Sequence, residues 1–508
     1  MQWDVSVGQA TLLTFLVGLS VGTLATVLAL LVSLGAFWFR IAGWRFAVGL
    51  VSSFLLVPVY VQATAWSAGF GSNGWLRLSQ VDAAKSPWMG VASVVWIHAC
   101  AALPYCFWIV SLGLRRIHDA RVDQALVEFG PSFALRWQIL PRLGPWLLGA
   151  FLWAFACVQY DMVVTNLFQT PTLCESVYQQ VQFGKLRSVP ILIAWAISIL
   201  CGLALALSVF FSMWQGATQA DRSPVDSAGS DRFDAAIARP WYAWLTLSVW
   251  GVLTVCCMVP WMNLISRMGW SSVLVEGRGV RSWSLSEVVA AFGHVADFRA
   301  EFGWSLQLSL WTVGLSLFLT ASMIPWSGNR YRAAWLFGVL GCMLATPGPL
   351  INLLIGQFLN RWLSDSWSFL SDQTLLGPIL ALQFRVLPVV FGLIWVAQQQ
   401  YLRRYGELLA LEAGLPYRMR FYAWMRFVQR GWIIAFWIGF SIAFGDLASY
   451  LLVQPPGVTT VAMRMFDLLH YGTKNREAGL AVVLAFFGAL SSIAWLRVPR
   501  GGHISDRS

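Results

Sequence analysis

The 508-residue chain has 58% apolar residues, 11% charged residues and a mean hydropathy of +0.65, which excludes an ordinary soluble globular protein. Its net charge of +11 does not indicate nucleic-acid binding, because the basic residues form short clusters between apolar runs. The composition instead predicts an all-α integral membrane protein.

Apolar runs long enough to span a membrane recur along the chain. A spanning helix needs about 20 mainly apolar residues. Eleven runs approach or exceed this length. They cover approximately residues 10–38, 46–70, 88–113, 143–166, 187–214, 241–265, 302–326, 332–358, 375–400, 430–454 and 477–496. The sequence therefore predicts about eleven transmembrane helices.

The loops between these runs differ in their arginine content. The arginine-rich segments 40–45, 115–142, 222–239, 330–332, 403–430 and 497–507 all fall on one side if the spans alternate. Basic loops stay in the cytoplasm during insertion. We therefore expect the amino terminus outside and the carboxyl terminus in the cytoplasm of a multi-pass membrane protein.

One stretch of the chain occurs twice. Residues 102–142 and 386–426 align without a gap at an offset of 284, and each copy leads from an apolar run into a charged segment. The offset places Pro104 on Pro388, Glu128 on Glu412 and Gly130 on Gly414. A second shared element, at an offset of 285, begins with Asp161 in one copy and Asp446 in the other.

The repeat divides the chain into two halves. We predict a first five-span repeat in 1–214, a cytoplasmic linker in 215–240, and an extra span with an external loop in 241–301. A second five-span repeat covers 302–496, and a cytoplasmic tail covers 497–508. Because five is an odd number of spans, a second copy fused directly to the first would lie upside down in the membrane. The extra span restores its orientation, so we predict two parallel repeats. Within the external loop, 284–302 is expected to form an interfacial amphipathic helix.

The polar part of the duplicated stretch has a common pattern in both copies. Acidic residues precede the glycine, and basic and aromatic residues follow it. Copy one contains Asp123, Glu128, Gly130, Arg136, Trp137 and Arg142, and copy two contains Glu407, Glu412, Gly414, Arg420, Phe421 and Arg426. The pattern predicts a helix, a break at the glycine and a second helix. The alternative is a solvated basic loop whose likeness is a remnant of gene duplication.

This pattern resembles the EAA loop of inner-membrane permeases of binding-protein-dependent ABC importers. The resemblance covers nearly the whole chain as two fused permease domains, similar to the ferric-iron-type permeases. The Glu-Ala-Ala of the family motif is replaced here by Gln124-Ala125-Leu126 and by Leu408-Leu409-Ala410.

The resemblance implies a function and a set of partners. The duplicated segments would be coupling helices that receive two copies of a cytoplasmic ATPase, which binds the ATP and Mg²⁺. No cofactor is expected in this chain itself. An external solute-binding protein would deliver the substrate across a bacterial inner membrane. Ferric iron is the substrate that the resemblance favours, with thiamine or a small organic solute as the alternative.

Three charged residues fall inside predicted spans. Asp161 and Asp446 lie near the outer ends of equivalent spans, and Arg385 lies near the middle of its own. Intramembrane charges are costly and are often functional, so these residues are candidates for the translocation path. Arg385 either pairs with a carboxylate such as Asp446 as a structural ion pair, or it contacts an anionic group on the substrate.

Other signatures narrow the class of function. His98 and His470 lack neighbouring ligands at metal-site spacing, so we predict no metal site. The chain has no G-x-x-x-x-G-K-[ST] motif, so we expect a transport subunit that is not an enzyme and draws energy from elsewhere. An ion-coupled secondary transporter, which also uses internal repeats, is the competing class, and a membrane scaffold without transport is a third.

Overall fold

The protein is described here by a computed structural model. It describes residues 6–71, 87–117, 120–183, 188–218, 240–275, 278–362, 373–411, 417–470 and 475–497. Within these residues, eight helices are long and apolar enough to cross a membrane. A ninth span is obtained if a helix pair bent by 103° is counted as one. The prediction of an all-α membrane protein with many spans is confirmed at this level.

In the part of the first half that the structure describes, the regular elements are all helical. Its elements are α1 (Val7–Ser33), the π-helical turn η1 (Leu34–Trp38), α2 (Trp44–Ser53), α3 (Val59–Phe70), α4 (Pro87–Ile117), α5 (Ala120–Phe129), α6 (Pro131–Phe133), the π-helical turn η2 (Ala134–Ile139), α7 (Leu140–Tyr160), α8 (Val163–Leu167), α9 (Leu173–Gln182) and α10 (Ser188–Thr218). Helices α1 and α10 are almost uniformly apolar, as expected for helices surrounded by lipid and by other helices.

The extra span and the second half follow. They contain α12 (Pro240–Leu253), η3 (Thr254–Met258), α13 (Val259–Met268), strands β1 (Trp270–Val275) and β2 (Arg278–Trp283), α14 (Leu285–Gly293), η4 (His294–Phe298), α15 (Arg299–Met323), η5 (Pro325–Gly328), α16 (Arg330–Ala345), α17 (Gly348–Trp362), α19 (Leu376–Leu411), α20 (Tyr417–Gly445), α21 (Val461–His470) and α22 (Asn475–Arg497).

Two predicted spans are broken helices rather than straight ones. The predicted span 46–70 is α2 and α3, separated by Phe54–Pro58, and the predicted span 332–358 is the bent pair α16 and α17. Each second helix follows a proline, Pro58 or Pro347, which lacks a backbone N–H and disfavours helical geometry at the preceding residue. Broken helices at membrane depth are stable only where protein groups satisfy the freed backbone.

Each half contains a bundle of three helices that pack on one another. In the first half these are α1, α4 and α7, and in the second half they are α15, α19 and α20. A polar contact also recurs: the Thr14 hydroxyl on α1 accepts a hydrogen bond from the Leu173 N–H at the start of α9 (2.7 Å). The Ser305 hydroxyl on α15 accepts one from the Val461 N–H at the start of α21 (2.9 Å).

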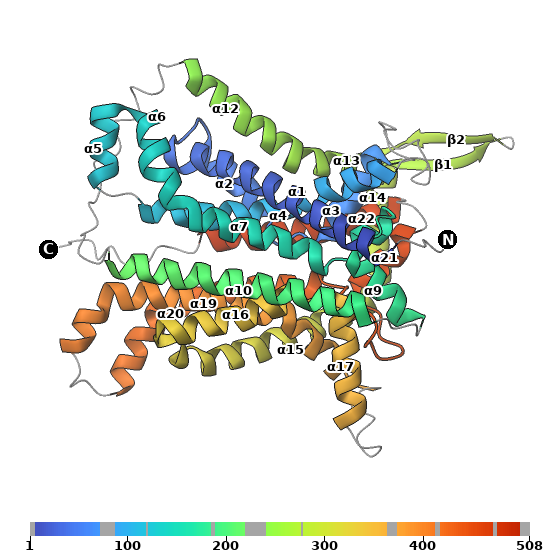
Figure 1. Ribbon diagram of the computed structural model, residues 1–508. Coiled ribbons are helices and arrows are strands. Elements are labelled where there is room, and N and C mark those ends of the chain that lie inside the picture. Colours follow the sequence, from blue (N-terminus) through green and yellow to red (C-terminus); the bar gives the residue numbers. More distant parts are fainter. Residues whose placement is uncertain are drawn as a thin grey trace.

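The last helix of each half packs against the other half. Helix α10 lies along α16 (Figure 1), and α22 packs against α2, α3, α13 and α14. Gly202 on α10 faces the carbonyl oxygen of Gly338 on α16, where a Cβ atom would clash with the backbone. The two halves are therefore interlocked, which the sequence did not predict.

The segment between the halves differs in part from its prediction. Helices α12 and α13, with η3, form the extra candidate span. The loop after it contains an antiparallel hairpin in which Trp270 pairs with Trp283, so the protein is not purely helical. The predicted amphipathic helix over 284–302 is present only in part: α14, capped by the Ser284 hydroxyl, ends at Gly293 and is followed by η4 and the start of α15.

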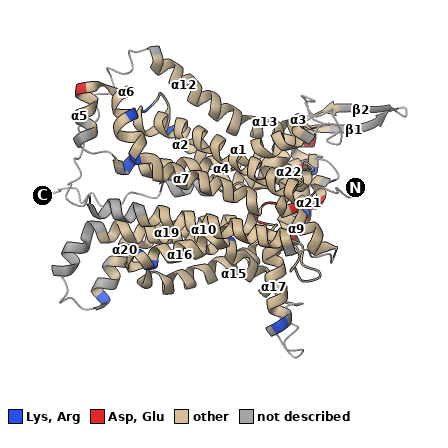
Figure 2. Cartoon of the chain, viewed as in Figure 1, with Lys and Arg blue, Asp and Glu red and all other residues tan. Residues whose placement is uncertain are grey.

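The molecule has two distinct ends (Figure 1). The α5 end carries α5, α6, the last turns of α19 and the first turns of α20, and the hairpin end carries β1, β2, α9, α14 and α21. Among the residues coloured by charge, Lys and Arg gather mainly toward the α5 end (Figure 2). This is the side that the arginine-rich loops predict to be cytoplasmic.

Candidate functional site

Two equivalent aspartates follow directly after the fourth predicted span of each half, which is α7 in the first half and α20 in the second. Asp161 follows α7 and accepts hydrogen bonds from the backbone N–H groups of Val163 (3.3 Å) and Val164 (3.0 Å), so its carboxylate caps the start of α8. Asp446 follows α20 and accepts hydrogen bonds from the backbone N–H (3.2 Å) and the hydroxyl of Ser449. Both carboxylates are buried. The chain therefore turns at each aspartate, and the carboxylate holds the turn.

Asp161 has a basic partner that the sequence analysis did not assign to it. His98, on α4, is buried, and its Nε2 lies 3.1 Å from Asp161 Oδ2. Its Nδ1 lies 2.9 Å from the Val94 carbonyl oxygen, which can only accept, so Nδ1 carries a proton. His98 and Asp161 form a buried hydrogen-bonded pair, so His98 is not an isolated histidine.

Asp446 has a different basic partner in the second half. Arg385, on α19, is 1% exposed, and its Nε lies 3.8 Å from Asp446 Oδ2. The pairing of Arg385 with Asp446 that we considered from sequence is confirmed. His98 is one helical turn from Ala101, the position that aligns with Arg385. Each half therefore pairs its aspartate with a base on its third predicted span, which is α4 in the first half and α19 in the second.

The guanidinium of Arg385 also holds the bend between α16 and α17. Its Nε donates to the Ser449 hydroxyl (3.2 Å), and its Nη atoms donate to the carbonyl oxygens of Leu344 and Thr346. Carbonyl groups in the last turn of a helix have no partner within the helix and carry partial negative charge. Arg385 supplies those partners where water cannot. Its N–H groups are thus directed at the protein, which supports a structural role.

Arg385 also contacts the first half of the molecule. The guanidinium carbon lies 4.0 Å from the centroid of the Tyr160 ring, in a cation–π arrangement. Tyr160 precedes Asp161, so this contact joins the two aspartate sites. A hydrogen bond also joins the two halves nearby: the Ser441 hydroxyl on α20 donates to the Leu56 carbonyl oxygen at the α2–α3 break (2.9 Å).

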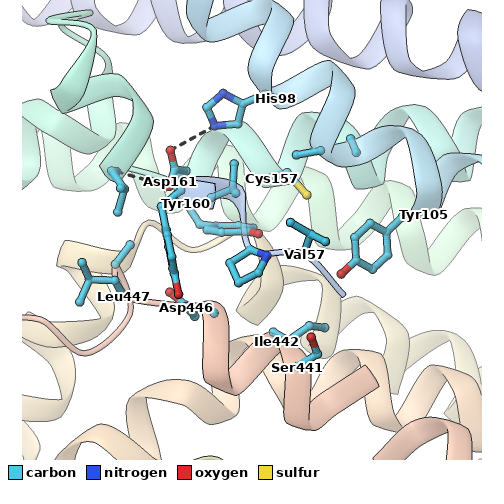
Figure 3. A pocket seen from close by; sticks show the side chains of 18 of the residues that line it. Val57, His98, Tyr105, Cys157, Tyr160, Asp161, Ser441, Ile442, Asp446 and Leu447 are labelled. Carbon is cyan, nitrogen blue, oxygen red and sulfur yellow. Dashed lines mark hydrogen bonds and ion pairs between the residues drawn. The ribbon is translucent and has the colours of Figure 1, made fainter. Parts of the chain in front are cut away.

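A small cavity with several polar side chains in its wall, which we call the chamber, lies at this junction. Its volume is about 90 Å³, and its walls come from the α2–α3 break, α4, α7 and the end of α20. Figure 3 shows His98 bonded to Asp161 on one side of the chamber, with Asp446 and Ser441 on the other. The lining includes the phenols Tyr60, Tyr105 and Tyr160.

A larger cavity, which we call the aromatic cavity, adjoins the chamber. It has a volume of about 520 Å³ and is lined by residues of both halves. Tyr105 lines both spaces. Apolar residues dominate the wall, and six of its residues are aromatic: Tyr105, Trp108, Trp146, Trp153, Phe337 and Trp395. Arg115 and Gln399, late in α4 and α19, line it toward the α5 end.

Comparisons with protein-family models, with curated proteins and with solved structures find no match for this chain. Within the described residues, no group of three or more His, Cys, Asp or Glu side chains is placed to hold a metal ion. The features of the molecule that bear on function are the two cavities and the α5 end.

The first copy of the duplicated segment has the predicted local structure. Helix α5 ends at Phe129, Gly130 adopts a left-handed conformation with φ +83°, and a second helical segment begins at Pro131. A side chain is strained at such a φ, so the glycine is needed for the turn. The predicted break at Gly130 is confirmed. Figure 1 shows α5 and α6 projecting from the bundle at the α5 end.

Exposed aromatic residues run across this turn. Phe129 lies 4.6 Å from Phe133, and Phe133 lies 6.4 Å from Trp137, between ring centroids. Phe129 and Trp137 are each 60% exposed. Arg136 stacks over Trp137 at 5.5 Å, and the exposed Glu128 accepts a hydrogen bond from Gln124 (2.8 Å). We call this surface, formed by Glu128, Phe129, Phe133, Arg136 and Trp137, the α5 knob.

Other predicted residues of the two segments are placed less completely. Arg142 lies on α7, where its guanidinium donates to Gln138 (3.2 Å), apart from the exposed aromatic row. Asp123 lies on α5, Glu407 near the end of α19, and Arg420, Phe421 and Arg426 early in α20, but only their backbone is described. Glu412 and Gly414 lie outside the described residues.

Proposed function

We propose that the chain is the membrane-spanning permease subunit of an ATP-driven importer, in which two halves enclose one translocation path. The α5 knob carries this proposal. A contiguous row of exposed aromatic rings at a protein surface, flanked by charges, is typical of a surface that a partner covers. Its occurrence in a segment present twice in the chain supports docking of two identical ATPase subunits.

The arrangement of the halves supports the same proposal. Equivalent three-helix bundles, equivalent aspartates and the recurring Thr14 and Ser305 contacts are expected of two related units. The aromatic cavity lies between them and is lined by both. ATP-driven closure of two ATPase subunits would move the two duplicated segments together, and the rigid helices would pass that motion to the cavity walls.

The direction of the path follows from the two ends of the molecule. The basic α5 end would face the cytoplasm of a bacterial inner membrane, and the hairpin end would face an external solute-binding protein. Arg385, Tyr160, Asp161 and Asp446 then separate the aromatic cavity from the outside. The resemblance favours ferric iron as substrate, with thiamine or a small organic solute as the alternative.

A second function is favoured by one specific observation. Buried carboxylates at equivalent positions of two repeats, lining a small cavity, are also expected in an ion-coupled secondary transporter. The two functions differ in what drives them. Transport by the purified chain under a proton gradient alone, with no ATPase partner recovered, would establish the secondary transporter and refute the importer.

Copurification in mild detergent tests the docking surface. Trp137→Ser should reduce recovery of the ATPase strongly, because a central aromatic contact contributes about 2 kcal/mol or more to an interface. Trp326→Ser is the matched control: Trp326 is also exposed and stacked on an arginine, but lies outside the duplicated segments. Equal recovery from both variants would remove the main support for the proposal.

Charge reversal provides an independent test of the same surface. Glu128→Lys combined with Glu412→Lys should abolish ATPase association while leaving the chain folded in the membrane. Unchanged association and transport in this double variant would show that the duplicated segments are remnants without a docking role.

A further inference from the structure

We propose that the chamber binds the cationic group of an organic substrate, and that the aromatic cavity receives the apolar, ring-bearing body of the same molecule. This inference rests on the proposed function only in taking the space between the halves as the translocation path. It selects one substrate class from those considered above.

The chamber has the chemistry of a cation site. Phenol rings of Tyr60, Tyr105 and Tyr160 line it together with the carboxylates of Asp161 and Asp446. Aromatic faces attract ammonium groups through the ring quadrupole, and cages of several rings recognise methylated ammonium groups. One of these rings, Tyr160, already holds the guanidinium of Arg385 at 4.0 Å, so Tyr60 and Tyr105 are the rings left for a ligand. These two rings and the two carboxylates are the wall groups that would attract a cation.

The cations of the protein are not directed into the chamber. Arg385 does not line it, and its N–H groups bond to Ser449 and to the carbonyl oxygens at the end of α16. His98 lines it but is held between Val94 and Asp161. An ionised carboxylate offers about four acceptor positions. Asp161 uses three and Asp446 two for hydrogen bonds within the described residues, so both retain capacity.

The sizes of the two spaces match the two parts of the proposed ligand. The chamber, at about 90 Å³, admits a small head group but is well below the roughly 300–1,000 Å³ of pockets for drug-sized ligands. The aromatic cavity, at about 520 Å³, falls within that range. Its wall carries one formally charged side chain among the described residues, Arg115, at the α5 end. An apolar wall stabilises an organic body and offers little to a bare metal ion.

Binding to the purified full-length chain in lipid nanodiscs tests the inference. The probes are tetramethylammonium, its neutral analogue tert-butanol, phenyltrimethylammonium and ferric citrate. We expect tetramethylammonium to bind at least about tenfold more tightly than tert-butanol, because only the cation gains cation–π and carboxylate interactions. Phenyltrimethylammonium should bind more tightly still, because its ring enters the aromatic cavity.

Paired variants identify the groups responsible. Tyr105→Leu should weaken tetramethylammonium binding about tenfold, whereas Tyr105→Phe, which keeps the ring, should stay within about threefold of the parent chain. Asp161→Asn should also weaken binding, and Tyr331→Leu, at an exposed aromatic residue far from the chamber, should have no effect. The Tyr105 pair keeps the test decisive if Asp161→Asn fails to fold.

Three contrary results would refute the proposed cation site or the proposed substrate class. Equal affinity for tetramethylammonium and tert-butanol would refute the cation site, as would equal binding by the two Tyr105 variants. Saturable binding of ferric citrate without binding of either ammonium probe would show that the path serves a metal. No ATPase is needed for these measurements, so their failure is distinguishable from failure of the importer proposal, which copurification tests.

Discussion

Removing the buried guanidinium of Arg385 should destabilise the protein more than any loss of a surface charge. Arg385→Met keeps most of the side-chain volume but leaves Asp446 as a buried carboxylate without its ion-pair partner. It also leaves the carbonyl oxygens of Leu344 and Thr346 without donors at the α16–α17 bend. Breaking one partner of a buried ion pair costs about 3–5 kcal/mol, and we expect a loss in this range.

A double-mutant cycle separates the ion pair from the helix cap. Asp446→Asn removes the unpaired charge, so Arg385→Met combined with Asp446→Asn should be less destabilised than the sum of the two single variants by about 1–3 kcal/mol. The remaining loss reports the orphaned carbonyl groups, which the double variant does not repair. Arg418→Met, at an exposed position of α20, is the control and should change stability by about 0.5 kcal/mol or less.

Stability can be followed with a thiol-reactive fluorescent dye during denaturation in detergent. All eight cysteines are free, and five of them are buried, so they react when the helices separate. Strictly additive effects of the two single variants would refute the ion pair as an energetic unit. A loss from Arg385→Met no larger than that from Arg418→Met would refute both the pair and the cap.

Three further predictions address other positions. Gly130→Ala should destabilise the α5–α6 turn by about 1–2 kcal/mol and reduce ATPase recovery. No atom lies within 4 Å of a Cβ at this position, so the whole penalty comes from placing a side chain on a left-handed backbone. Full ATPase recovery would contradict a fixed turn. Gly445→Ala should lower stability by about 1–3 kcal/mol, because its Cβ would lie 2.7 Å from Pro58 at the α2–α3 break; a neutral thermal shift would contradict this packing between the halves. His98→Leu should lower the stability of the protein by about 1–3 kcal/mol, because buried Asp161 loses its hydrogen-bond partner, and adding Asp161→Asn should recover part of that loss. If thiol accessibility shows that the effects of the two substitutions on stability simply add, the pair is not an energetic unit.

Local sequence properties were sufficient for much of the architecture. The length and apolarity of the runs predict membrane-spanning helices, because a lipid environment requires each backbone to satisfy its own hydrogen bonds. Gly130 was located from the residues around it, since the need for a left-handed turn is a property of the local backbone. Asp161 and Asp446 were identified as equivalent because the duplicated pattern is visible in one dimension.

The prolines in the two broken spans do not by themselves determine where a helix ends. Pro58 and Pro347 mark positions at which a helix can end, but proline also occurs inside the continuous helices α4 and α19, at Pro104 and Pro388. Whether a proline kinks a helix or divides it depends on the groups available to bond the freed carbonyls. Arg385 provides them for α16, and it comes from a helix that begins well after α17 ends.

The sequence by itself determined that this is a membrane protein of many helices, with a duplicated segment and two equivalent buried aspartates. Only the tertiary structure decided which base each aspartate meets, that α10 and α22 exchange between the halves, and that three tyrosines and two carboxylates line one chamber. His98 and Asp161 are 63 residues apart, and their contact depends on how α4 and α7 pack. Side-chain contacts between distant segments are set by helix packing, for which an almost uniformly apolar sequence carries little directional information.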